Sequence, residues 1–361
     1  MTTANFHRWL SKKDDLPAIQ NCFTIVIFVV FLWAVSLSET SQANDGIGAV
    51  GVGGVVVAGK TDKVQIRKEV LEVGLSKIKV SYEFVNITDQ SVTLPVMFPL
   101  PRYGGFNGYF GEPEAFKVLI DGQRMTYQTN VRAMQCQYRE GQESCQDVTD
   151  TLKKNGLSDR QIAYFPPDML PSLSDRQVQD LLRLGLIDRR TYGNNNLSPE
   201  WEVEVTYLWQ VTFPVNKVVL VEHEYMPFRS EGTAAMQDES EMRNKFCADN
   251  ALISFWKKKD LVNKFNGTPN IEYILTTANT WAGPIDEFTL ILRKSKPSEL
   301  ISLCFPGKVV KVDPVTLEIR LTNFTPEHEL NVLFMNGIEY EIPGIGQAPS
   351  FNHRSNSQEV P

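Results

Sequence analysis

His223 is one candidate in this chain for a catalytic side chain. It lies in the segment VEHEYMP, where Glu222 and Glu224 flank it. A histidine whose ring is oriented by a carboxylate can act as a general base, so this trio resembles part of a hydrolase site. In an extended strand, however, neighbouring side chains point to opposite faces, so neither glutamate can orient His223 directly. We favour a structural histidine, with a hydrolase of unfamiliar site near His223 or Trp281 as the alternative.

A second candidate is the tryptophan in residues 275–292, LTTANTWAGPIDEFTLIL. Asn279, Trp281 and Asp286 would offer a stacking surface and polar groups together, as the floor of a small-ligand or carbohydrate pocket does. Against this, Gly283-Pro284 supplies a turn, and an alternating strand follows it. We favour a structural corner in which Trp281 covers the end of a sheet.

Other catalytic and cofactor patterns are missing or out of place. The chain has no GxSxG elbow, P-loop or EF-hand loop, and its cysteines and histidines lack the spacing of a zinc site. Residues 46–51, GIGAVG, fit the dinucleotide pattern GxGxxG, but that motif needs a strand before it and a helix after it. We therefore expect no catalytic residue, no cofactor and no metal.

The N-terminus has the pattern of an export signal. Residues 23–37, FTIVIFVVFLWAVSL, are apolar and follow Arg8, Lys12 and Lys13, and small residues precede Asn44. A basic start, a short apolar core and a small-residue cleavage site are typical of a secretory signal peptide. We predict cleavage after Ala43 and a periplasmic or secreted protein. The alternative is a membrane anchor formed by residues 23–37, although about 20 residues are needed to span a bilayer comfortably.

The cysteines agree with export. Of the five in the chain, Cys22 would leave with the signal, and an even number would remain. Spacing alone leaves their pairing open. We favour Cys136–Cys145, because the intervening QYREGQES has the character of a surface loop, and this leaves Cys247–Cys304. The alternative is four buried thiols.

Charge limits the partners. The formal net charge is −7, which disfavours nucleic acid and anionic membrane surfaces. We expect contact with a membrane only through an uncleaved signal. Another envelope protein is the partner class that suits an exported chain.

Period-two alternation of apolar residues predicts β-strands over most of the chain. In WEVEVTYLWQVTF, residues 201–213, every second residue is apolar, whereas Glu202, Glu204 and Gln210 share the other face. We interpret the aromatic row as the core face of a sheet rather than a sugar-stacking surface. Asp121-Gly122, between alternating runs, predicts a tight hairpin.

Helices are predicted in two places. The pentapeptide LSDRQ occurs at Leu157 and again at Leu173, and Ser-Asp before a mixed run is a helix-start signal. A second helical segment is predicted near 239–265. The fold class that follows is mainly β, with two β-sandwich-like regions and an α-helical insertion. The predicted division is a signal peptide 1–43, an N-terminal region 44–146, the insertion 147–198, a C-terminal region 199–343 and a disordered tail 344–361.

Several stretches resemble a known family. The start NDGIGAVGVGGVVVAG, the segments YEFVN and FPLP, and the later WEVEVTYLWQVTFP, HEYMPF, NTWAGP and SLCFPG resemble exported bacterial proteins grouped as domain of unknown function 4424. The resemblance implies export and a two-part β-rich fold, and no activity. YEFVN to FPLP, followed by AFKVLIDGQRM, is also similar to the start of the VIT domain, an extracellular β-sandwich, but the D-x-S-x-S cation motif is missing.

The function predicted from sequence is therefore an exported, non-catalytic binding or assembly module of the bacterial envelope. The hydrolase and the carbohydrate or small-ligand binder are the alternatives.

Overall fold

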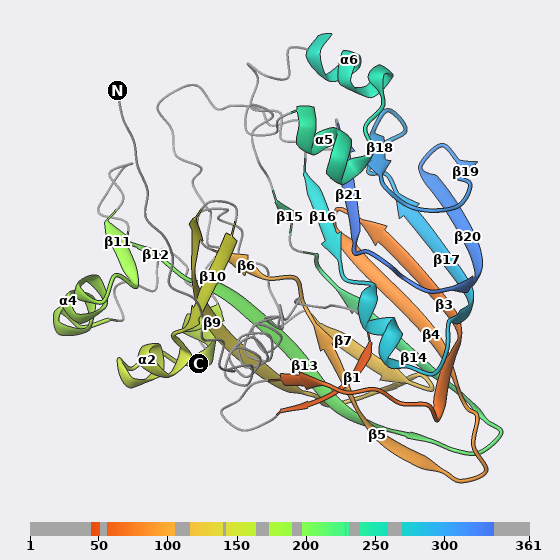
Figure 1. The fold of residues 1–361 in the computed structure, drawn as a ribbon, viewed down its shortest axis with the longest axis horizontal. Helices are drawn as coiled ribbons and strands as arrows, with labels where there is room; N and C mark the ends of the chain where they lie inside the picture. The colour runs from red at the N-terminus through yellow and green to blue at the C-terminus, as the bar shows by residue number, and fades with distance from the viewer. Residues whose placement is uncertain are drawn as a thin grey trace, which may run out of the picture. The chain divides into compact units, whose positions relative to one another are not determined.

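β-strands dominate the part of the chain that the computed structural model describes (Figure 1). That part comprises residues 45–50, 56–104, 116–139, 142–163, 173–189, 197–227, 229–230, 239–258 and 269–335. These residues belong to one compact unit, Ser41–Pro361. The predicted signal 1–43, with its apolar run 23–37, and the predicted tail 344–361 lie outside the described residues. The fold class is mainly β, as predicted.

The larger sheet has eight strands and combines both ends of the described chain. Its centre is the parallel pair of β3 (Val64–Gly74) and β17 (Ile285–Arg293), and the other strands pair antiparallel. The order is β19 (Val310–Asp313), β20 (Thr316–Phe324), β17, β3, β4 (Lys77–Asn86), β14 (Val218–Tyr225), β7 (Lys117–Ile120) and β8 (Gln123–Arg124). Strands from the predicted N-terminal and C-terminal regions thus share one sheet.

The second sheet has seven strands around the predicted aromatic strand. The order is β10 (Gln142–Asp147), β9 (Gln128–Arg139), β13 (Glu202–Phe213), β5 (Val92–Pro99), β1 (Gly46–Val50) and β2 (Val56–Ala58), with β6 (Tyr103–Gly104) also on β13. Along β13 the alternate residues from Trp201 to Phe213 are all buried, which confirms the predicted core face.

Aromatic contacts join the two sheets. Phe84 on β4 meets Phe213 on β13 edge to face, with ring centroids 5.6 Å apart. Phe98 on β5 lies 5.2 Å from Phe116, which precedes β7. The inner faces of both sheets therefore share one hydrophobic core.

Asp121 and Gly122 form the predicted hairpin between β7 and β8. Both have positive φ, 49° and 78°. A two-residue loop with positive φ at both positions matches the twist of the flanking strands, and Asp-Gly tolerates it.

The repeated LSDRQ starts two helices, α3 (Asp159–Ala163) and α4 (Asp175–Arg183). Ser174 accepts from the Gln177 backbone amide, and the Gln177 side chain accepts from the Ser174 amide. Ser158 and Gln161 repeat the pattern. Such a capping box satisfies backbone donors that have no partner in the first turn. With α2 (Thr149–Lys154) and the pair β11 (Ile187–Arg189) and β12 (Leu197–Pro199), these helices fill the described part of the predicted insertion.

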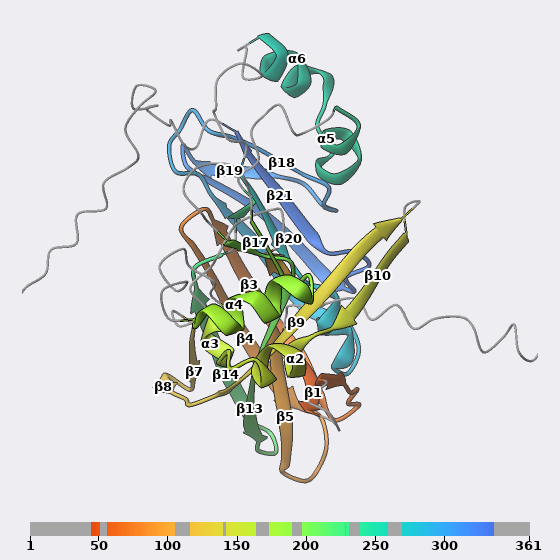
Figure 2. The same ribbon diagram turned by 90° about the vertical axis from the view of Figure 1, so that its left-hand side faces the viewer.

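The second helical segment is also present, as α5 (Glu239–Phe246) and α6 (Asn250–Lys258). Residues 259–265 of that prediction lie outside the described residues. α5 contacts a small four-stranded sheet, as Figures 1 and 2 show. Its strands are β15 (Arg229–Ser230), β16 (Asn270–Tyr273), β21 (Leu330–Met335) and β18 (Leu300–Leu303).

Both favoured disulfides are present. Cys136–Cys145 joins directly opposed positions of β9 and β10. Cys247–Cys304 ties the turn between α5 and α6 to the residue that follows β18. The first disulfide fixes β10 to β9, and the second fixes the α5–α6 turn to the end of β18. Such cross-links suit a chain that folds in an oxidising compartment.

Candidate functional site

Five ionisable residues meet in the middle of the shared core. Asp45 precedes β1, Glu69 is on β3, Tyr82 is on β4, His223 is on β14 and Tyr273 is on β16, and all five are 0% exposed. We call these residues the buried centre. Burying ionisable groups is costly unless they pair or hydrogen-bond, so their convergence needs a physical account.

A carboxylate–imidazole pair forms one half of the buried centre. His223 Nε2 lies 2.8 Å from Asp45 Oδ1. Aromatic rings surround the imidazole: the centroids of Phe98, Phe116 and Trp209 lie 5.1, 5.4 and 5.2 Å from it. Glu222 and Glu224 point to the opposite face of β14, where they pair with lysines. The orienting carboxylate is thus Asp45, which is distant in sequence.

Two tyrosines form the other half. The Tyr82 and Tyr273 hydroxyl oxygens are 3.1 Å apart. The Asp45 amide donates to the Tyr82 hydroxyl at 3.5 Å, which connects the two halves. Glu69 lies directly opposite Tyr82 in the β3–β4 pair.

Burial sets the protonation states. It raises the pKa of the Asp45 carboxyl, while His223 acts in the opposite direction. Desolvation, followed by the neighbouring Tyr273 hydroxyl and the Glu69 carboxyl, raises the pKa of Tyr82 well above its usual range. Desolvation and then Glu69 do the same to the pKa of Tyr273. Both phenols are therefore neutral donors at physiological pH.

Trp281 closes the centre from the corner that the sequence predicted. It follows the short 3-10 helix η6 (Thr276–Thr280), and Gly283 after it has a φ of 68°. Its indole Nε1 donates to the Asp45 carbonyl at 2.7 Å, and its ring lies 4.5 Å from Phe84. Trp281 and His223 therefore hold the same residue, Asp45, from two sides.

The other predicted site residues, Asn279 and Asp286, each have a hydrogen-bond partner outside the buried centre. Asn279 donates from Nδ2 to the Pro326 carbonyl at 2.9 Å, and Asp286 accepts from Gln65 Nε2 at 2.7 Å. Trp281 is only 4% exposed, so its ring presents little surface on which a ligand could stack.

Asp45 and Glu69 were missed by sequence reasoning. Glu69 faces the core because the alternation of buried residues along β3 shifts by one position. Val64 and Ile66 are buried before the shift, and Glu69, Leu71 and Val73 are buried after it. A β-bulge between Ile66 and Lys68 causes this change, because Arg67 is an extra residue opposite β4. For Asp45 no local signal exists, since its partners come from distant segments.

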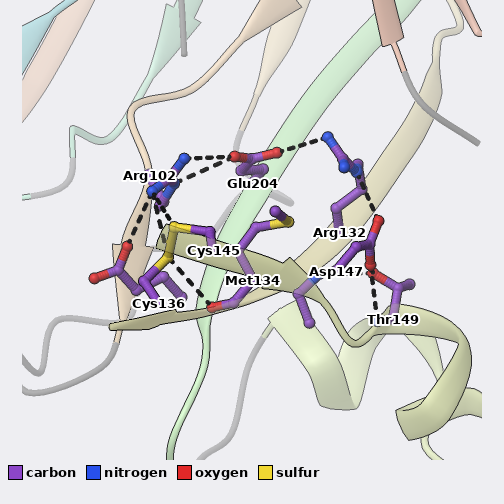
Figure 3. A network of polar contacts seen from close by, with 10 residues as sticks. Arg102, Arg132, Met134, Cys136, Cys145, Asp147, Thr149 and Glu204 are labelled. Atoms are coloured by element: carbon purple, nitrogen blue, oxygen red, sulfur yellow. Dashed lines mark hydrogen bonds and ion pairs between the residues drawn. A yellow bond between two sulfur atoms is a disulfide. The ribbon is translucent and has the colours of Figure 1, made fainter. Parts of the chain in front are cut away.

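A second constellation lies at the β9–β10 hairpin (Figure 3). Glu204 on β13 accepts from Arg102 Nη2 at 3.0 Å and from Arg132 Nη1 at 3.1 Å. Arg132 also donates to Asp147 at 3.1 Å, and Asp147 accepts from the Thr149 hydroxyl at 2.6 Å. This chain of charges ties β13 to the hairpin and to the start of α2.

The hairpin disulfide lies against the same network. Arg102 Nη1 is 3.5 Å from Cys136 Sγ, 3.4 Å from Cys145 Sγ and 2.9 Å from Glu143 Oε1. The two sulfurs and a Glu143 oxygen lie within 4.8 Å of one another, which is the spacing of metal ligands. The sulfurs are bonded to each other, and a fixed guanidinium would repel a cation. The cluster thus favours a structural role.

The fold and these two sites define a mainly β protein with two disulfides and a fully buried ionisable centre. The chain belongs to the family described as Domain of unknown function (DUF4424), which matches residues 43–333. No curated protein matches it. Among the described residues, no helix has the length and apolar character needed to cross a membrane.

Solved structures give distant likenesses. A candidate nutrient-binding protein from Legionella pneumophila is 11% identical, with a TM-score of 0.41 over 82% of this chain and 73% of that one. Yeast LTA4 hydrolase is 8% identical, with a TM-score of 0.25 over 85% and 32% of the chains. An M1 zinc metallopeptidase from Deinococcus radiodurans is 10% identical, with a TM-score of 0.23 over 76% and 43%. Likenesses this weak carry no functional argument.

Proposed function

We propose that this protein is an exported, non-catalytic binding or assembly module of the bacterial envelope. The observation that carries the binding role is the edge of the eight-stranded sheet. β19 ends that sheet, and its residues are all exposed, Val310 and Val312 by 48% and 57%. Val309, just before the strand, is 46% exposed. Lys311 and Asp313 give this short edge strand the charge that soluble proteins normally place there, but Val310 and Val312 leave exposed apolar side chains beside them, which supports a docking partner.

The strand at the opposite end of the sheet has no exposed apolar side chain. β8 ends it with Gln123 and Arg124, both polar and exposed. We infer that a partner protein adds a strand beside β19, pairing with the backbone groups on the side of β19 that meets no other described strand and covering the valines. The predicted signal peptide and the two disulfides support the envelope as the place where this happens.

The closed centre weighs against the enzymatic alternative. A hydrolase near His223 would need its imidazole open to substrate, and that side chain is 0% exposed. A carbohydrate binder would need an exposed aromatic row, and the row on β13 is buried.

A photo-reactive amino acid placed at Val312 in living cells tests the proposal. We expect a cross-link to one envelope protein, and none from the matched position Met226, which is 48% exposed but away from this edge. The captured protein is then purified and its affinity measured for the wild type and for the Val310→Lys, Val312→Lys double variant. Equal affinity for both would contradict strand addition at β19. Cross-links only between two copies of this chain would replace a foreign partner with self-assembly.

A further inference from the structure

The hairpin disulfide joins β9 to a strand that buries none of its own side chains. β10 is the last strand in the order of the seven-stranded sheet, and each of its residues is exposed or half-buried. Six register pairs join its backbone to β9. The hairpin can therefore keep its strand pairing when the bond between Cys136 and Cys145 is broken. Both cysteines are half-buried, so a reagent in solution can approach their sulfurs.

Arg102 contacts both sulfurs through a single nitrogen. Its Nη1 lies 3.5 Å from Cys136 Sγ and 3.4 Å from Cys145 Sγ (Figure 3). A neutral sulfur accepts hydrogen bonds only weakly. A thiolate, in contrast, accepts a charge-assisted hydrogen bond from a guanidinium. The contact with Arg102 therefore stabilises a reduced, ionised sulfur more than it stabilises the disulfide.

Three carboxylates hold the guanidinium in place. Glu204 accepts from Nε and Nη2 at 3.2 and 3.0 Å, and Glu143 and Glu202 lie 2.9 and 3.5 Å from Nη1. Burial opposes the charge on Arg102, but these carboxylates, Glu204 first, raise the pKa of its guanidinium above the ordinary value. Arg102 is thus a permanent cation fixed against the disulfide.

The same carboxylates repel a thiolate, but less strongly than Arg102 attracts it. Glu204 also pairs with Arg132 at 3.1 Å, so a second guanidinium offsets its charge. Glu143, whose oxygen lies within 4.8 Å of the sulfurs, has a side chain that is 40% exposed, so water screens it. The direct contact with Arg102 Nη1 is therefore the stronger effect on the sulfurs.

The two sulfurs differ in a further neighbour. Cys136 Sγ lies 3.9 Å from the Met134 carbonyl oxygen, which can accept a thiol proton but repels a thiolate. After reduction, Cys136 is thus suited to the thiol form and Cys145 to the thiolate form. In thiol–disulfide exchange, the sulfur that is more stable as a thiolate leaves faster. The favoured reaction is therefore attack on Cys136 with departure of Cys145.

We propose that Cys136–Cys145 is a site of reversible thiol–disulfide exchange with a protein dithiol. One thiol of the dithiol ionises, its thiolate attacks Cys136 Sγ, and the electron pair of the broken bond leaves with Cys145 Sγ, which accepts from Arg102. The second sulfur of the dithiol then attacks the first, and Cys136 departs and takes the proton of that second thiol. This chain gains two electrons, the dithiol becomes a disulfide, and one proton enters the solvent. The inference goes beyond the proposed binding role and does not rest on it.

Reduction of the full chain by dithiothreitol, a small dithiol, tests the proposal. Samples are quenched with an alkylating agent, and peptide mass spectrometry quantifies each cysteine. We expect Arg102→Gln to slow reduction of Cys136–Cys145 about tenfold, because the leaving thiolate loses its guanidinium. The matched control is Arg139→Gln, which removes the same charge from the tip of the same hairpin and should change the rate by less than about twofold. Cys247–Cys304 in the same samples should be reduced at one rate in all three proteins.

The pH dependence of alkylation identifies the charged sulfur. In the reduced wild type, the reaction of Cys145 with iodoacetamide should have its midpoint below about pH 8.5, the ordinary value for a cysteine thiol, and Arg102→Gln should raise that midpoint. A wild-type midpoint at or above that value would overturn the proposal. Equal or faster reduction of Cys136–Cys145 in Arg102→Gln would do the same.

If Arg102→Gln fails to fold, the half-exposed Glu143 decides the matter. Glu143→Gln removes a carboxylate near both sulfurs, so it should lower the alkylation midpoint of Cys145. An unchanged midpoint would then contradict the proposed role of charge at this disulfide. Each of these outcomes leaves the strand-addition proposal at β19 untouched.

Discussion

At the scale of single residues, burial decides what His223 does. The same imidazole–carboxylate geometry that orients a general base in an enzyme is here sealed by aromatic rings. The pair therefore joins β14 to the segment before β1 and stabilises the fold.

His223→Ala should lower the free energy of unfolding by about 3–5 kcal/mol, because it leaves the Asp45 carboxyl in the core without the imidazole. Urea denaturation followed by tryptophan fluorescence measures this. The control is His328→Ala, an exposed position that should change stability by less than about 0.5 kcal/mol. Equal stability of both variants would show that the pair contributes nothing.

Asp147 makes a contribution to the free energy of unfolding that depends on pH. Partial burial opposes ionisation, but hydrogen bonds from Thr149 and Arg132 prevail and lower the pKa of the Asp147 carboxyl below its ordinary value of 3.8. Since the folded pKa is the lower one, the stabilisation is present above pH 3.8 and is lost as pH falls below it.

The difference in unfolding free energy between wild type and Asp147→Asn should thus shrink as the pH falls from 6 toward 2, in urea titrations at each pH. The exposed Asp150→Asn serves as the comparison. A difference that stays constant with pH would mean that the Asp147 carboxyl has the same pKa in the folded and the unfolded protein.

At the scale of elements, the two disulfides constrain loops of different length. Cys136 and Cys145 are separated by 9 positions and Cys247 and Cys304 by 57. If the main effect is the lost freedom of the unfolded chain, the contributions are about 3 and about 4 kcal/mol respectively.

Replacing each pair by alanines should therefore destabilise the protein more at Cys247–Cys304. Urea unfolding of both double variants checks the order. The reverse order would indicate that the Arg102 network adds stability to the hairpin only while its disulfide is intact.

Local patterns predicted elements well where neighbours in sequence determine them. The Asp121-Gly122 hairpin, the aromatic face of β13 and the two helix starts at LSDRQ all follow from residues a few positions apart. The LSDRQ prediction missed only that the glutamine reaches back to complete a capping box. The buried centre could not be predicted in this way. It depends on a bulge that reorients Glu69 and on a hydrogen bond between Asp45 and His223, 178 positions apart.

At the scale of the whole molecule, the parallel β3–β17 pair unites the two predicted regions in one sheet. Leu290 on β17 is 0% exposed in the shared core. The two predicted regions could unfold separately only if the contacts of β3 and β17 with each other and with the shared core were weak.

Leu290→Ala should cost about 2–5 kcal/mol and lower the stability of both regions together. Hydrogen exchange should show faster exchange in β4 as well as in β20, and circular dichroism and fluorescence should report one coincident transition. Two separate transitions, with only one shifted by the substitution, would show that 44–146 and 199–343 unfold independently.

The bulge at Arg67 has a consequence for how this strand can evolve. With Arg67 present, both halves of β3 direct their apolar residues to the same core although they are out of phase. Loss of this single residue would exchange the two faces over half the strand and would turn either Val64 and Ile66, or Glu69, Leu71 and Val73, toward solvent. Substitutions along β3 change one contact at a time, whereas a one-codon deletion here would turn one half of the strand's core face away from the core in a single step.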